Sequence, residues 1–448
     1  MNFQQNSLFN HNLKWEILNE KPLNDFKTLQ LYVFSNKKKE FQFKALIKTG
    51  SRILKQCKNN KIKYLDVKNC ILKKIHHYQN GDGIKITSGN FQFEFYGQIT
   101  EWFEQLKLYC IQVDFQSNYI IGNLIGKGTY GKVYKALQKQ NKCEYAIKTF
   151  DKSNLQKQIE IDAIQREIEI LRIIQHPRVI QLLETYESET HIFVVYELLK
   201  GGELKQLMNE KKLNQDQCVT IIYKIIDALS YIHSKGIIHR DLKPENLIFR
   251  YTQNIDDIVI ADFGLADFYR KDGQYLFARC GTAGYLAPEL IMNKIYDYKV
   301  DVYSVGIVFY MLINGGKSPF EKIDYATQLQ QNMMSNIDLT KLIITNECQD
   351  LLSKMIDSNP QTRITSQQAK IHPLFHKQHE KIELQTTRLP KSLTLSLIET
   401  PKTQAIQSSR LKKQSFVQIS QSAKNSPIET KKLTGQIIFS NTKQKQQQ

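Results

Sequence analysis

The fold of this chain is decided by the stretch His239-Arg240-Asp241-Leu242-Lys243-Pro244-Glu245-Asn246. Asp262-Phe263-Gly264 begins sixteen residues after Asn246, and Ala287-Pro288-Glu289 follows later in the chain. Any single Asp, Lys or Asn of this kind is more often a surface residue than a catalytic one. The joint occurrence of these motifs in this order makes coincidence negligible, so they indicate one functional site.

A glycine-rich segment, Gly126-Lys127-Gly128-Thr129-Tyr130-Gly131, lies upstream of these motifs. Taken alone it is a weak signal, because G-x-G-x-x-G occurs both in dinucleotide-binding folds and in phosphate-binding hairpins. A dinucleotide fold would open a helix after the third glycine, but here residues 132–136 alternate like a strand and the chain returns through 145–148. The segment is therefore predicted to be a hairpin whose glycines let the backbone approach a triphosphate. Val133 and Ala146 can sandwich an adenine ring.

Lys148, in the returning strand of this hairpin, completes a set that resembles the eukaryotic protein kinase family over residues 119–375. Within that family the set looks most like the calmodulin-dependent and related basophilic Ser/Thr kinases. The resemblance implies a bilobal α+β kinase fold, ATP and Mg²⁺ as ligands, and transfer of the γ-phosphoryl group to Ser/Thr hydroxyls of proteins. Such transfer depends on positioning and electrostatics, so it needs metal-binding groups, a cation near the phosphates and an acceptor for the hydroxyl proton.

The resemblance implies which residues bind the phosphates and the metal ions. Lys148 would hold the α and β phosphates and pair with Glu167, which lies on the helical stretch 163–174. Asp262 would bind the Mg²⁺ that bridges the β and γ phosphates, and Asn246 would bind a second Mg²⁺. The pairing of Lys148 with Glu167 would decide whether the enzyme is active.

The catalytic loop would supply the groups that act on the substrate hydroxyl. By the same resemblance, Asp241 would orient the attacking hydroxyl and accept its proton, and Lys243 would steady the γ phosphate. Three further residues are expected to be structural. Glu289 should pair with Arg363, and Asp301 should brace the backbone of the catalytic loop.

The nucleotide pocket and the substrate groove also have expected residues. Those expected to bind ATP are Ile125, Gly126, Lys127, Gly128, Thr129, Tyr130, Gly131, Val133, Ala146, Lys148, Glu197, Leu199 and Glu203. Tyr196, just before the expected hinge residue Glu197, would narrow the pocket behind adenine. Glu203 and Glu245 match acidic positions with which relatives attract arginine or lysine upstream of the phosphorylated residue, so substrates with basic residues are expected. Thr282 is expected to face the substrate and is typical of the Ser/Thr branch.

The segment between residues 264 and 280 contains no Ser or Thr. In many relatives a phosphothreonine in this segment neutralises the arginine that matches Arg240, whereas here the corresponding region has Ala278. We therefore expect activation not to require Ser/Thr phosphorylation of this segment. Asp272, phosphorylated Tyr275 or simple packing would order it instead.

The competing function is that of a pseudokinase, a scaffold or adaptor that uses this fold to bind nucleotide and partners without phosphoryl transfer. The residues that the resemblance assigns to catalysis and metal binding favour an enzyme, because all are present: Lys148, Glu167, Asp241, Asn246 and Asp262. Nucleotide binding without transfer to a basic peptide would identify the scaffold.

Residues 25–115 are expected to form an all-β module closed by one helix. Stretches with strand character, many of them separated by turn signals, cover 31–34, 41–47, 53–54, 62–67, 71–75, 84–86 and 91–95. Residues 99–111 then switch to helical spacing and include Trp102. This order resembles a pleckstrin-homology (PH) domain. Only Lys44 and the loop 37–39 are available to bind an anionic lipid there; the alternative is solvated lysines on a scaffold that contacts the kinase domain or another protein.

The formal net charge of +18 is concentrated at the two ends of the chain. Residues 1–115 carry 18 Lys/Arg against 10 Asp/Glu, residues 116–375 carry 31 against 30, and residues 376–448 carry 13 against 4. A surface that binds a nucleic-acid backbone is itself basic, so the neutral middle argues against DNA or RNA as a partner.

The flanks are expected to regulate the enzyme. Residues 1–24 are an N-terminal extension, and residues 380–448, rich in Ser, Thr, Gln and Lys, are expected to be a disordered basic tail. Regulation would come from docking of the PH-like domain or from the tail in the substrate groove. The tail has no clear basic amphipathic helix, so calmodulin is a conceivable partner without support.

The sequence is expected to belong to a cytoplasmic protein. The longest near-apolar stretch, 302–313, is shorter than the roughly 20 residues that cross a bilayer. The N-terminus has no pattern of a secretory leader and no glycine at position 2. Seven cysteines without a C-x-x-C pair fit reduced thiols better than disulfides or a zinc site. Peripheral recruitment to membranes would follow if the PH-like domain binds anionic lipid.

Overall fold

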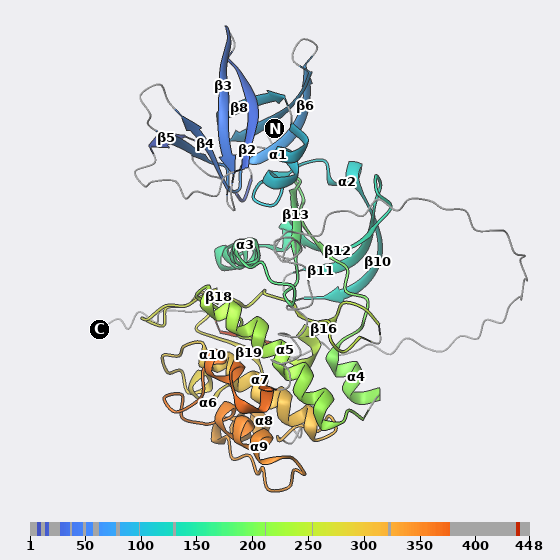
Figure 1. Ribbon diagram of the computed structural model, residues 1–448, viewed down its shortest axis with the longest axis vertical. Coiled ribbons are helices and arrows are strands. Elements are labelled where there is room, and N and C mark those ends of the chain that lie inside the picture. Colours follow the sequence, from blue (N-terminus) through green and yellow to red (C-terminus); the bar gives the residue numbers. More distant parts are fainter. Residues whose placement is uncertain are drawn as a thin grey trace, which may run out of the picture.

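The structure, a computed structural model, describes residues 7–9, 14–17, 27–35, 38–47, 51–56, 62–77, 81–97, 99–128, 131–210, 212–252, 254–320, 324–376 and 436–439. A β-rich N-terminal module, a smaller lobe built on a sheet and a larger helical lobe follow one another along the long axis (Figure 1). The two lobes are the bilobal arrangement expected for residues 119–375. Within the described ranges, no helix is both long enough and apolar enough to cross a membrane.

The smaller lobe consists of five antiparallel strands and one long helix. Its strands, in the order β10-β11-β12-β14-β13, are β10 (Tyr119–Lys127), β11 (Lys132–Gln138), β12 (Glu144–Asp151), β14 (His191–Glu197) and β13 (Leu182–Glu187). Helix α3 (Gln158–Ile173) packs on this sheet because apolar residues such as Ile164 and Ile168 recur along one face and are buried. β11 and β12 pair so that Val133 lies opposite Lys148, which is the hairpin that the glycine-rich segment predicts.

The larger lobe is mainly helical. Its helices are α4 (Leu204–Glu210), α5 (Gln215–Ser234), α6 (Pro288–Ile291), α7 (Lys299–Ile313), α8 (Tyr325–Met334), α9 (Asn346–Met355) and α10 (Ser366–Lys370). Its short strands are β15 (Ile237–Ile238) with β18 (Asp267–Phe268), β16 (Leu247–Phe249) with β17 (Ile258–Ile260), and β19 (Arg279–Thr282). Helix α7 is apolar on nearly every side and is buried from Val300 to Leu312, so with α5 it forms the centre of the lobe.

Three short 3₁₀ helices complete the two lobes. They are η2 (Lys152–Asn154), η3 (Pro244–Asn246) and η4 (Pro373–Phe375). Two of the three begin with proline, whose missing N–H is not needed at the first position of a helix. Helix η3 ends at Asn246, so this turn sets the position of a predicted metal-binding residue.

In its described residues, the N-terminal module has eight strands followed by a helix. The strands are β1 (Trp15–Ile17), β2 (Lys27–Ser35), β3 (Lys38–Ile47), β4 (Arg52–Gln56), β5 (Ile62–Asp66), β6 (Ile71–His77), β7 (Gly81–Ser88) and β8 (Phe91–Gly97). Helix α1 (Ile99–Leu106) buries Trp102 completely against a core that includes Leu65, Ile84 and Phe95. The seven strands β2–β8 and the helix lie where the sequence pattern predicts them.

Two details of the module differ from the expectation. Helix α1 ends at Leu106 rather than at residue 111, because residues 111–112 form strand β9 (Ile111–Gln112) before the short helix α2 (Phe115–Asn118). The strands are also divided between a three-stranded sheet, β1-β5-β4, and the large sheet, and no ladder among the described residues joins β3 to β4. These ladders do not close a PH-like barrel, so the PH-like assignment stays a prediction. Lys44 lies on β3, but the side chains of β3 and the loop residue Lys37 lie outside the described part of the chain.

Strand β9 makes one continuous sheet of the module and the smaller lobe. It pairs in parallel with β6 on one side and with β13 on the other. The sheet therefore has eleven strands, in the order β10-β11-β12-β14-β13-β9-β6-β7-β8-β2-β3.

The expected tail, 380–448, lies outside the described residues apart from one short segment. This segment is strand β20 (Gln436–Phe439), which pairs antiparallel with β19 of the larger lobe. The prediction of a tail without regular structure is therefore wrong for these four residues.

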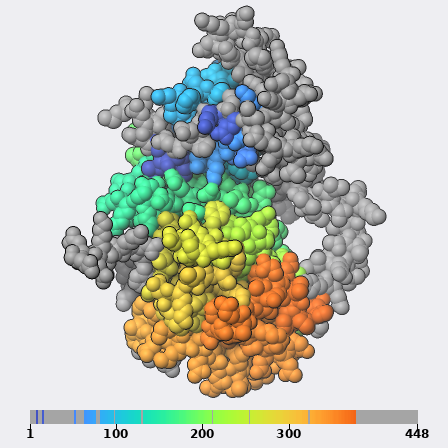
Figure 2. Space-filling model, turned by 90° about the vertical axis from the view of Figure 1, so that its left-hand side faces the viewer, coloured from blue at the N-terminus to red at the C-terminus, as the bar shows by residue number. Residues whose placement is uncertain are grey.

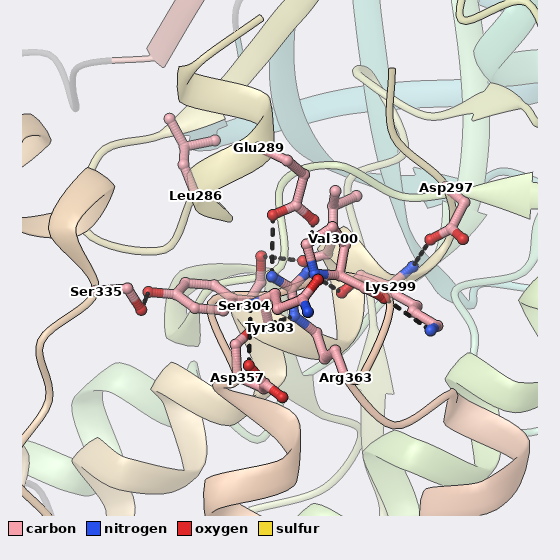
Figure 3. Close-up of polar contacts among 12 residues, drawn as sticks. Leu286, Glu289, Asp297, Lys299, Val300, Tyr303, Ser304, Ser335, Asp357 and Arg363 are labelled. Carbon is pink, nitrogen blue, oxygen red and sulfur yellow. Dashed lines mark hydrogen bonds and ion pairs between the residues drawn. The ribbon is translucent and has the colours of Figure 1, made fainter. Parts of the chain in front are cut away.

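A buried ion pair between Glu289 and Arg363 joins the start of α6 to the segment before α10 (Figure 3). The guanidinium donates from NH1 to Oε1 at 2.6 Å and from NH2 to Oε2 at 2.9 Å. Arg363 also donates to the carbonyls of Asp357 and Lys299, at 2.8 and 3.1 Å, and lies over the ring of Tyr303. The structure thus places together the two residues that the sequence analysis expects to pair.

We expect Glu289→Gln to lower the free energy of unfolding by about 3 kcal/mol, because the substitution leaves the buried Arg363 guanidinium without its counter-charge. The shift in the thermal unfolding of the full chain measures this effect. The matched control is Lys354→Gln, which breaks an exposed pair with Asp350 and should cost about 0.5 kcal/mol or less. Equal shifts for the two variants would contradict the expectation.

Candidate active site

A cleft between the two lobes receives residues from both of them. Most residues predicted to bind ATP line it, namely Ile125, Gly126, Lys127, Gly128, Val133, Ala146, Lys148, Glu197, Leu199 and Glu203. Gly131 is described but does not line the cleft, whereas Thr129 and Tyr130 lie outside the described residues. The larger lobe contributes Ile248 and Asp262 to the opposite wall. The cleft is thus a site that can hold a nucleotide between two lobes.

The glycine-rich segment lies close to the neighbouring strand β12 because its glycines have no side chain. A β-carbon on Gly131 would come within 2.7 Å of the carbonyl oxygen of Thr149, and one on Gly128 would lie 3.6 Å from Cε of Lys148. The N–H of Gly128 donates to the carbonyl of Gly131 at 2.8 Å and holds the turn. A larger residue at position 131 would therefore push the glycine-rich segment away from β12.

Lys148 and Glu167 form a buried ion pair in the cleft. The Nζ atom of Lys148 lies 2.8 and 2.9 Å from the two carboxylate oxygens of Glu167, and 3.4 Å from Oδ1 of Asp262. Burial alone would lower the pKa of Lys148, but the two carboxylates outweigh burial and raise it, so the amine stays charged. The hydroxyl of Tyr196 donates to Glu167 at 3.1 Å. Tyr196, which is expected to narrow the pocket behind adenine, therefore also holds the carboxylate that pairs with Lys148.

Asp262 and Asn246 are the two oxygen donors that the sequence analysis assigns to a metal. Burial would raise the pKa of Asp262, but nearby positive charges, led by Lys148, lower it, so the carboxylate is ionised. Asn246 donates its Nδ2 to the carbonyl oxygen of Asp241 at 2.8 Å and to its Oδ2 at 3.2 Å, which leaves the amide oxygen as a ligand atom. The backbone of Asp262 has a left-handed φ of 57°, a strained conformation of the kind found at functional sites.

The donor set fits a hard divalent cation that is shared with a phosphate. Among the residues that the structure describes, no three His, Cys, Asp or Glu side chains converge on one metal position. A cation such as Mg²⁺ takes only one or two oxygens from the protein and completes its shell with phosphate oxygens and water. Asp262 and Asn246 meet that requirement, whereas a site for a tightly held structural metal would need more ligands.

Besides Asn246, the side chains of Lys243 and Thr282 hold Asp241 in the catalytic loop. Lys243 donates its Nζ to Oδ2 of Asp241 at 2.9 Å, and Thr282 donates its hydroxyl to Oδ1 at 2.6 Å. The same Nζ donates to the hydroxyl of Thr282 at 2.8 Å. Thr282 lies on β19, so the carboxylate is tied to the strand that precedes the Ala287-Pro288-Glu289 motif. The structure thus brings the expected catalytic and substrate-facing residues into one hydrogen-bonded group.

Asp301 of α7 braces the backbone that leads into the catalytic loop. Its two carboxylate oxygens accept the backbone N–H groups of His239 and Arg240, each at 2.8 Å. His233 Nε2 lies 3.0 Å from the same carboxylate. Burial would raise the pKa of Asp301, but hydrogen bonding and charge at His233 lower it, so the carboxylate is ionised. This bracing holds Arg240 at a left-handed φ of 69°, a conformation that costs free energy in a non-glycine residue.

Arg240 has buried partners of its own. Its guanidinium donates to the carbonyls of Leu265 and Phe277, at 2.7 and 2.9 Å, and lies 3.6 Å from Oδ2 of Asp267. In this conformation the charge of Arg240 is compensated without a phosphate. Of the three alternatives for ordering the segment 264–280, the contacts of Arg240 therefore favour packing.

The other two alternatives are not supported by the contacts of Asp272 and Tyr275. Asp272 accepts a hydrogen bond from the backbone of Gln274 at 3.1 Å, which is a local turn. Tyr275 is buried, donates its hydroxyl to the carbonyl of Tyr296 at 3.1 Å, and stacks on the ring of the same residue. A kinase that modified Tyr275 would first have to displace it from this packing.

The two acidic residues expected to attract basic substrates differ in their surroundings. Glu203 is exposed and lines the cleft. Glu245 pairs with Lys205 through Oε1, whereas its Oε2 is buried and has no hydrogen-bond partner in the described part of the chain. A basic group of a substrate would therefore compete with Lys205 for Glu245.

Several residues of the cleft are not predicted from the sequence. They are Leu171, Ile180, Leu198, Ile248, Ala261 and Phe263. All six are apolar, and an apolar residue carries no chemical signal of a ligand. Ile248 and Ala261 had a positional signal, since they stand next to Leu247 and Asp262, whose surroundings the motifs already fix.

Comparisons with known proteins agree with this geometry. The protein kinase domain family matches residues 119–375. A probable myosin light chain kinase of Dictyostelium discoideum is 36% identical over 261 residues, which are 57% of this chain and 81% of that protein. CBL-interacting serine/threonine-protein kinase 20 of Arabidopsis thaliana is 37% identical over 278 residues, 61% of this chain and 62% of that protein. For CBL-interacting protein kinase 5 of Oryza sativa subsp. japonica the identity is 34% over 265 residues, 58% of this chain and 56% of that protein.

The chain therefore spans less than two thirds of these plant kinases, although it spans most of the Dictyostelium protein. The family match covers more than half of the chain and contains the whole cleft, from Ile125 to Phe263. ATP and a divalent metal are the general ligands of this family, in agreement with the donor set of the cleft. The motifs, the geometry and the relatives together show that this chain belongs to the protein kinase family, on its serine/threonine branch.

Proposed function

We propose that this protein transfers the γ-phosphoryl group of ATP, with Mg²⁺, to Ser or Thr hydroxyls of protein substrates that carry basic residues upstream of the acceptor. The observation that supports this best is the approach of Lys148 to both Glu167 and Asp262, within 3.4 Å, in one cleft. This arrangement puts a cation for the phosphates beside a carboxylate for the metal. The resemblance to the named kinases supports protein substrates in general, and the basic preference rests on Glu203 and Glu245.

The residues of the chain divide the work of the reaction. Bound ATP and its metal supply the phosphoryl group and the charge that offsets its oxygens. Lys148, held by Glu167, orients the α and β phosphates, while Asp262 and Asn246 provide the oxygen ligands for the cation. Asp241 accepts the proton of the incoming hydroxyl, and its oxygens are kept in place by the hydrogen bonds described above.

We expect Asp241→Asn to lower kcat by about 10²- to 10⁴-fold, because the amide cannot accept the hydroxyl proton. Asp262→Ala should abolish metal-dependent transfer, because it removes a ligand of the cation. Transfer of radiolabelled phosphate from ATP to an arginine-rich Ser peptide, with and without EDTA, measures both effects. Asp338→Asn, which changes an exposed carboxylate of the same lobe, is the control and should leave the rate unchanged.

A scaffold without phosphoryl transfer is the competing function. If the protein is a scaffold, the wild-type chain would bind ATP, and neither the wild type nor any variant would label the peptide. Wild-type labelling that is lost in Asp241→Asn while ATP binding persists would exclude the scaffold.

Activation of this kinase is proposed not to need phosphorylation of the segment 264–280. The buried partners of Arg240, namely Asp267 and backbone carbonyls, support this proposal because they compensate its charge internally. Phosphatase-treated recombinant protein should therefore phosphorylate the peptide at the same rate as untreated protein, within about twofold. An inert phosphatase-treated protein that recovers only when this segment is modified would show the proposal to be wrong.

The flanks are proposed to regulate the kinase domain. The N-terminal module is proposed to be a PH-like domain that meets an anionic lipid or another protein, on the grounds of the seven predicted strands β2–β8 and the closing helix α1. A cytoplasmic protein that is recruited peripherally to membranes fits this proposal. The boundaries that we propose are 25–115 for the module, 119–375 for the kinase domain and 380–448 for the tail.

The tail is proposed to compete with protein substrates through β20. Antiparallel pairing places Gln436 opposite Thr282, the residue that holds Asp241, and Ile438 opposite Cys280. An added strand offers main-chain hydrogen bonds in the way that an extended peptide does when it binds a sheet edge. A substrate peptide that approaches Asp241 would have to share this edge with β20.

We expect a chain that stops after residue 435 to have a lower KM for the peptide than the full chain, by up to about tenfold, since the competing strand is absent. The KM for ATP should not change. A chain that stops after Phe439 is the matched control, because it keeps β20 and lacks only residues 440–448. Identical peptide KM values for the two truncated chains would contradict the proposed competition.

A further inference from the structure

Helix α3 carries contacts to three parts of the protein at once. On the cleft side, Glu167 binds Lys148. Towards the segment 264–280, Arg166 lies 3.3 Å from Oδ1 of Asp267, and the other oxygen of Asp267 faces Arg240. The position of α3 therefore affects both the nucleotide cleft and the segment that leads to the substrate.

The third set of contacts joins α3 to the N-terminal module. Arg172, near the end of α3, is 4% exposed and donates from Nε to the carbonyl of Leu108 at 2.7 Å. Its NH1 donates to Oδ1 of Asn69 at 2.5 Å, and its NH2 donates to the carbonyl of Cys110 at 3.4 Å. All three acceptors belong to the module. In the described residues no carboxylate forms an ion pair with Arg172, so its buried charge depends on these acceptors.

The acceptors are preformed within the module. Asn69 has a left-handed φ of 62°, and its N–H donates to the carbonyl of Tyr109 at 2.9 Å. This bond holds the turn that follows β5 against the segment after α1. The fork of the guanidinium thus meets groups that a hydrogen bond within the module holds in place, which lowers the entropy cost of the contact.

Further contacts join the module to the smaller lobe. Lys68 pairs with Glu169 of α3, and Lys107 pairs with Glu184 of β13 at 2.9 Å. Strand β9 adds its backbone pairing with β13, in which Gln112 lies opposite Tyr186. Figure 2 shows the blue and cyan residues of the module resting on the teal residues of the smaller lobe. The module is part of the same sheet as the lobe and holds the side of α3 that faces away from the cleft.

We propose that Arg172 is a positioning residue, through which the N-terminal module holds α3 where Glu167 meets Lys148. The inference rests on the proposed kinase function and adds a regulation to it. A module that is docked on Arg172 keeps the kinase domain competent. A module that is displaced no longer anchors the end of α3, because the hydrogen bonds of Arg172 to Leu108, Asn69 and Cys110 are lost, and α3 can then move away from Lys148.

Substitutions on either side of the contact test this inference in the full chain. Arg172→Met should lower kcat for the arginine-rich peptide by roughly 5- to 150-fold, the usual range of coupling between sites. Asn69→Gly should lower kcat less than Arg172→Met does. It changes only the module and leaves α3 unaltered, and glycine adopts the left-handed φ without strain. Asn69→Asp keeps the acceptor and adds a counter-charge, and should retain wild-type kcat. Lys73→Gln, an exposed position of the same module, is the control and should have no effect.

A double-mutant cycle separates positioning from a merely structural role. In a Glu167→Gln background, Arg172→Met should cause little further loss of kcat, because Arg172 acts through Glu167. If the two losses multiply, Arg172 does not act through that pair and the inference is wrong. Low kcat in Asn69→Asp would also overturn it.

Hydrogen exchange keeps this inference distinguishable from the proposed function. The amides of α3 should exchange faster in Arg172→Met than in the wild type, whereas those of α7 should not change. If the wild type labels no peptide, the proposed function fails, and the exchange still tests the contact. If the wild type labels the peptide but α3 exchange and kcat are both unchanged by Arg172→Met, the positioning inference fails alone.

Discussion

The buried ion pair between Lys148 and Glu167 is the interaction on which the rest of the site depends. Burying two charges costs several kcal/mol per ion, and close pairing offsets that cost only when the geometry is good. Here the geometry is supplied from several directions. Strand β12 carries the amine, α3 carries the carboxylate, and Tyr196 donates a further hydrogen bond to it. A movement of α3 that separates the two charges leaves the Glu167 carboxylate without its cation and leaves Lys148 with Asp262 alone, so such a movement is costly.

A second group of buried charges does for the larger lobe what this pair does for the smaller one. Asp301 accepts two backbone N–H groups and thereby holds Arg240 at a left-handed φ. Arg240 in turn meets Asp267, which is shared with Arg166 of α3. The strained backbone of the catalytic loop is thus stabilised by charges that also reach the smaller lobe. The ion pairs of Asp267 with Arg166 and Arg240 thus link the two lobes near the cleft.

The chemistry of the site could be predicted from the sequence because it restricts the residue types. Position 148 requires a cation for the phosphates, and positions 262 and 246 require oxygen ligands for a metal. The order and spacing of Lys148, Asn246 and Asp262 in the sequence therefore predicted the site. The strands of the module were predictable for a different reason, since alternating burial leaves a period of two. A closed barrel was not predictable from that pattern, because the alternation does not say which strands pair.

The contacts between the flanks and the kinase domain could not be predicted in this way. Strands β9 and β20 have two and four residues, too few for any period, and their partners lie far away in the sequence. Arg172 is one of many Arg and Lys residues in the helices of this chain, and only its burial against the module, beside Asn69, distinguishes it from the others. The two flanks also act at different places. The module bears on α3 and would change kcat, whereas β20 bears on the edge beside Thr282 and would change the peptide KM. Regulation by either flank could therefore be recognised from kinetics alone.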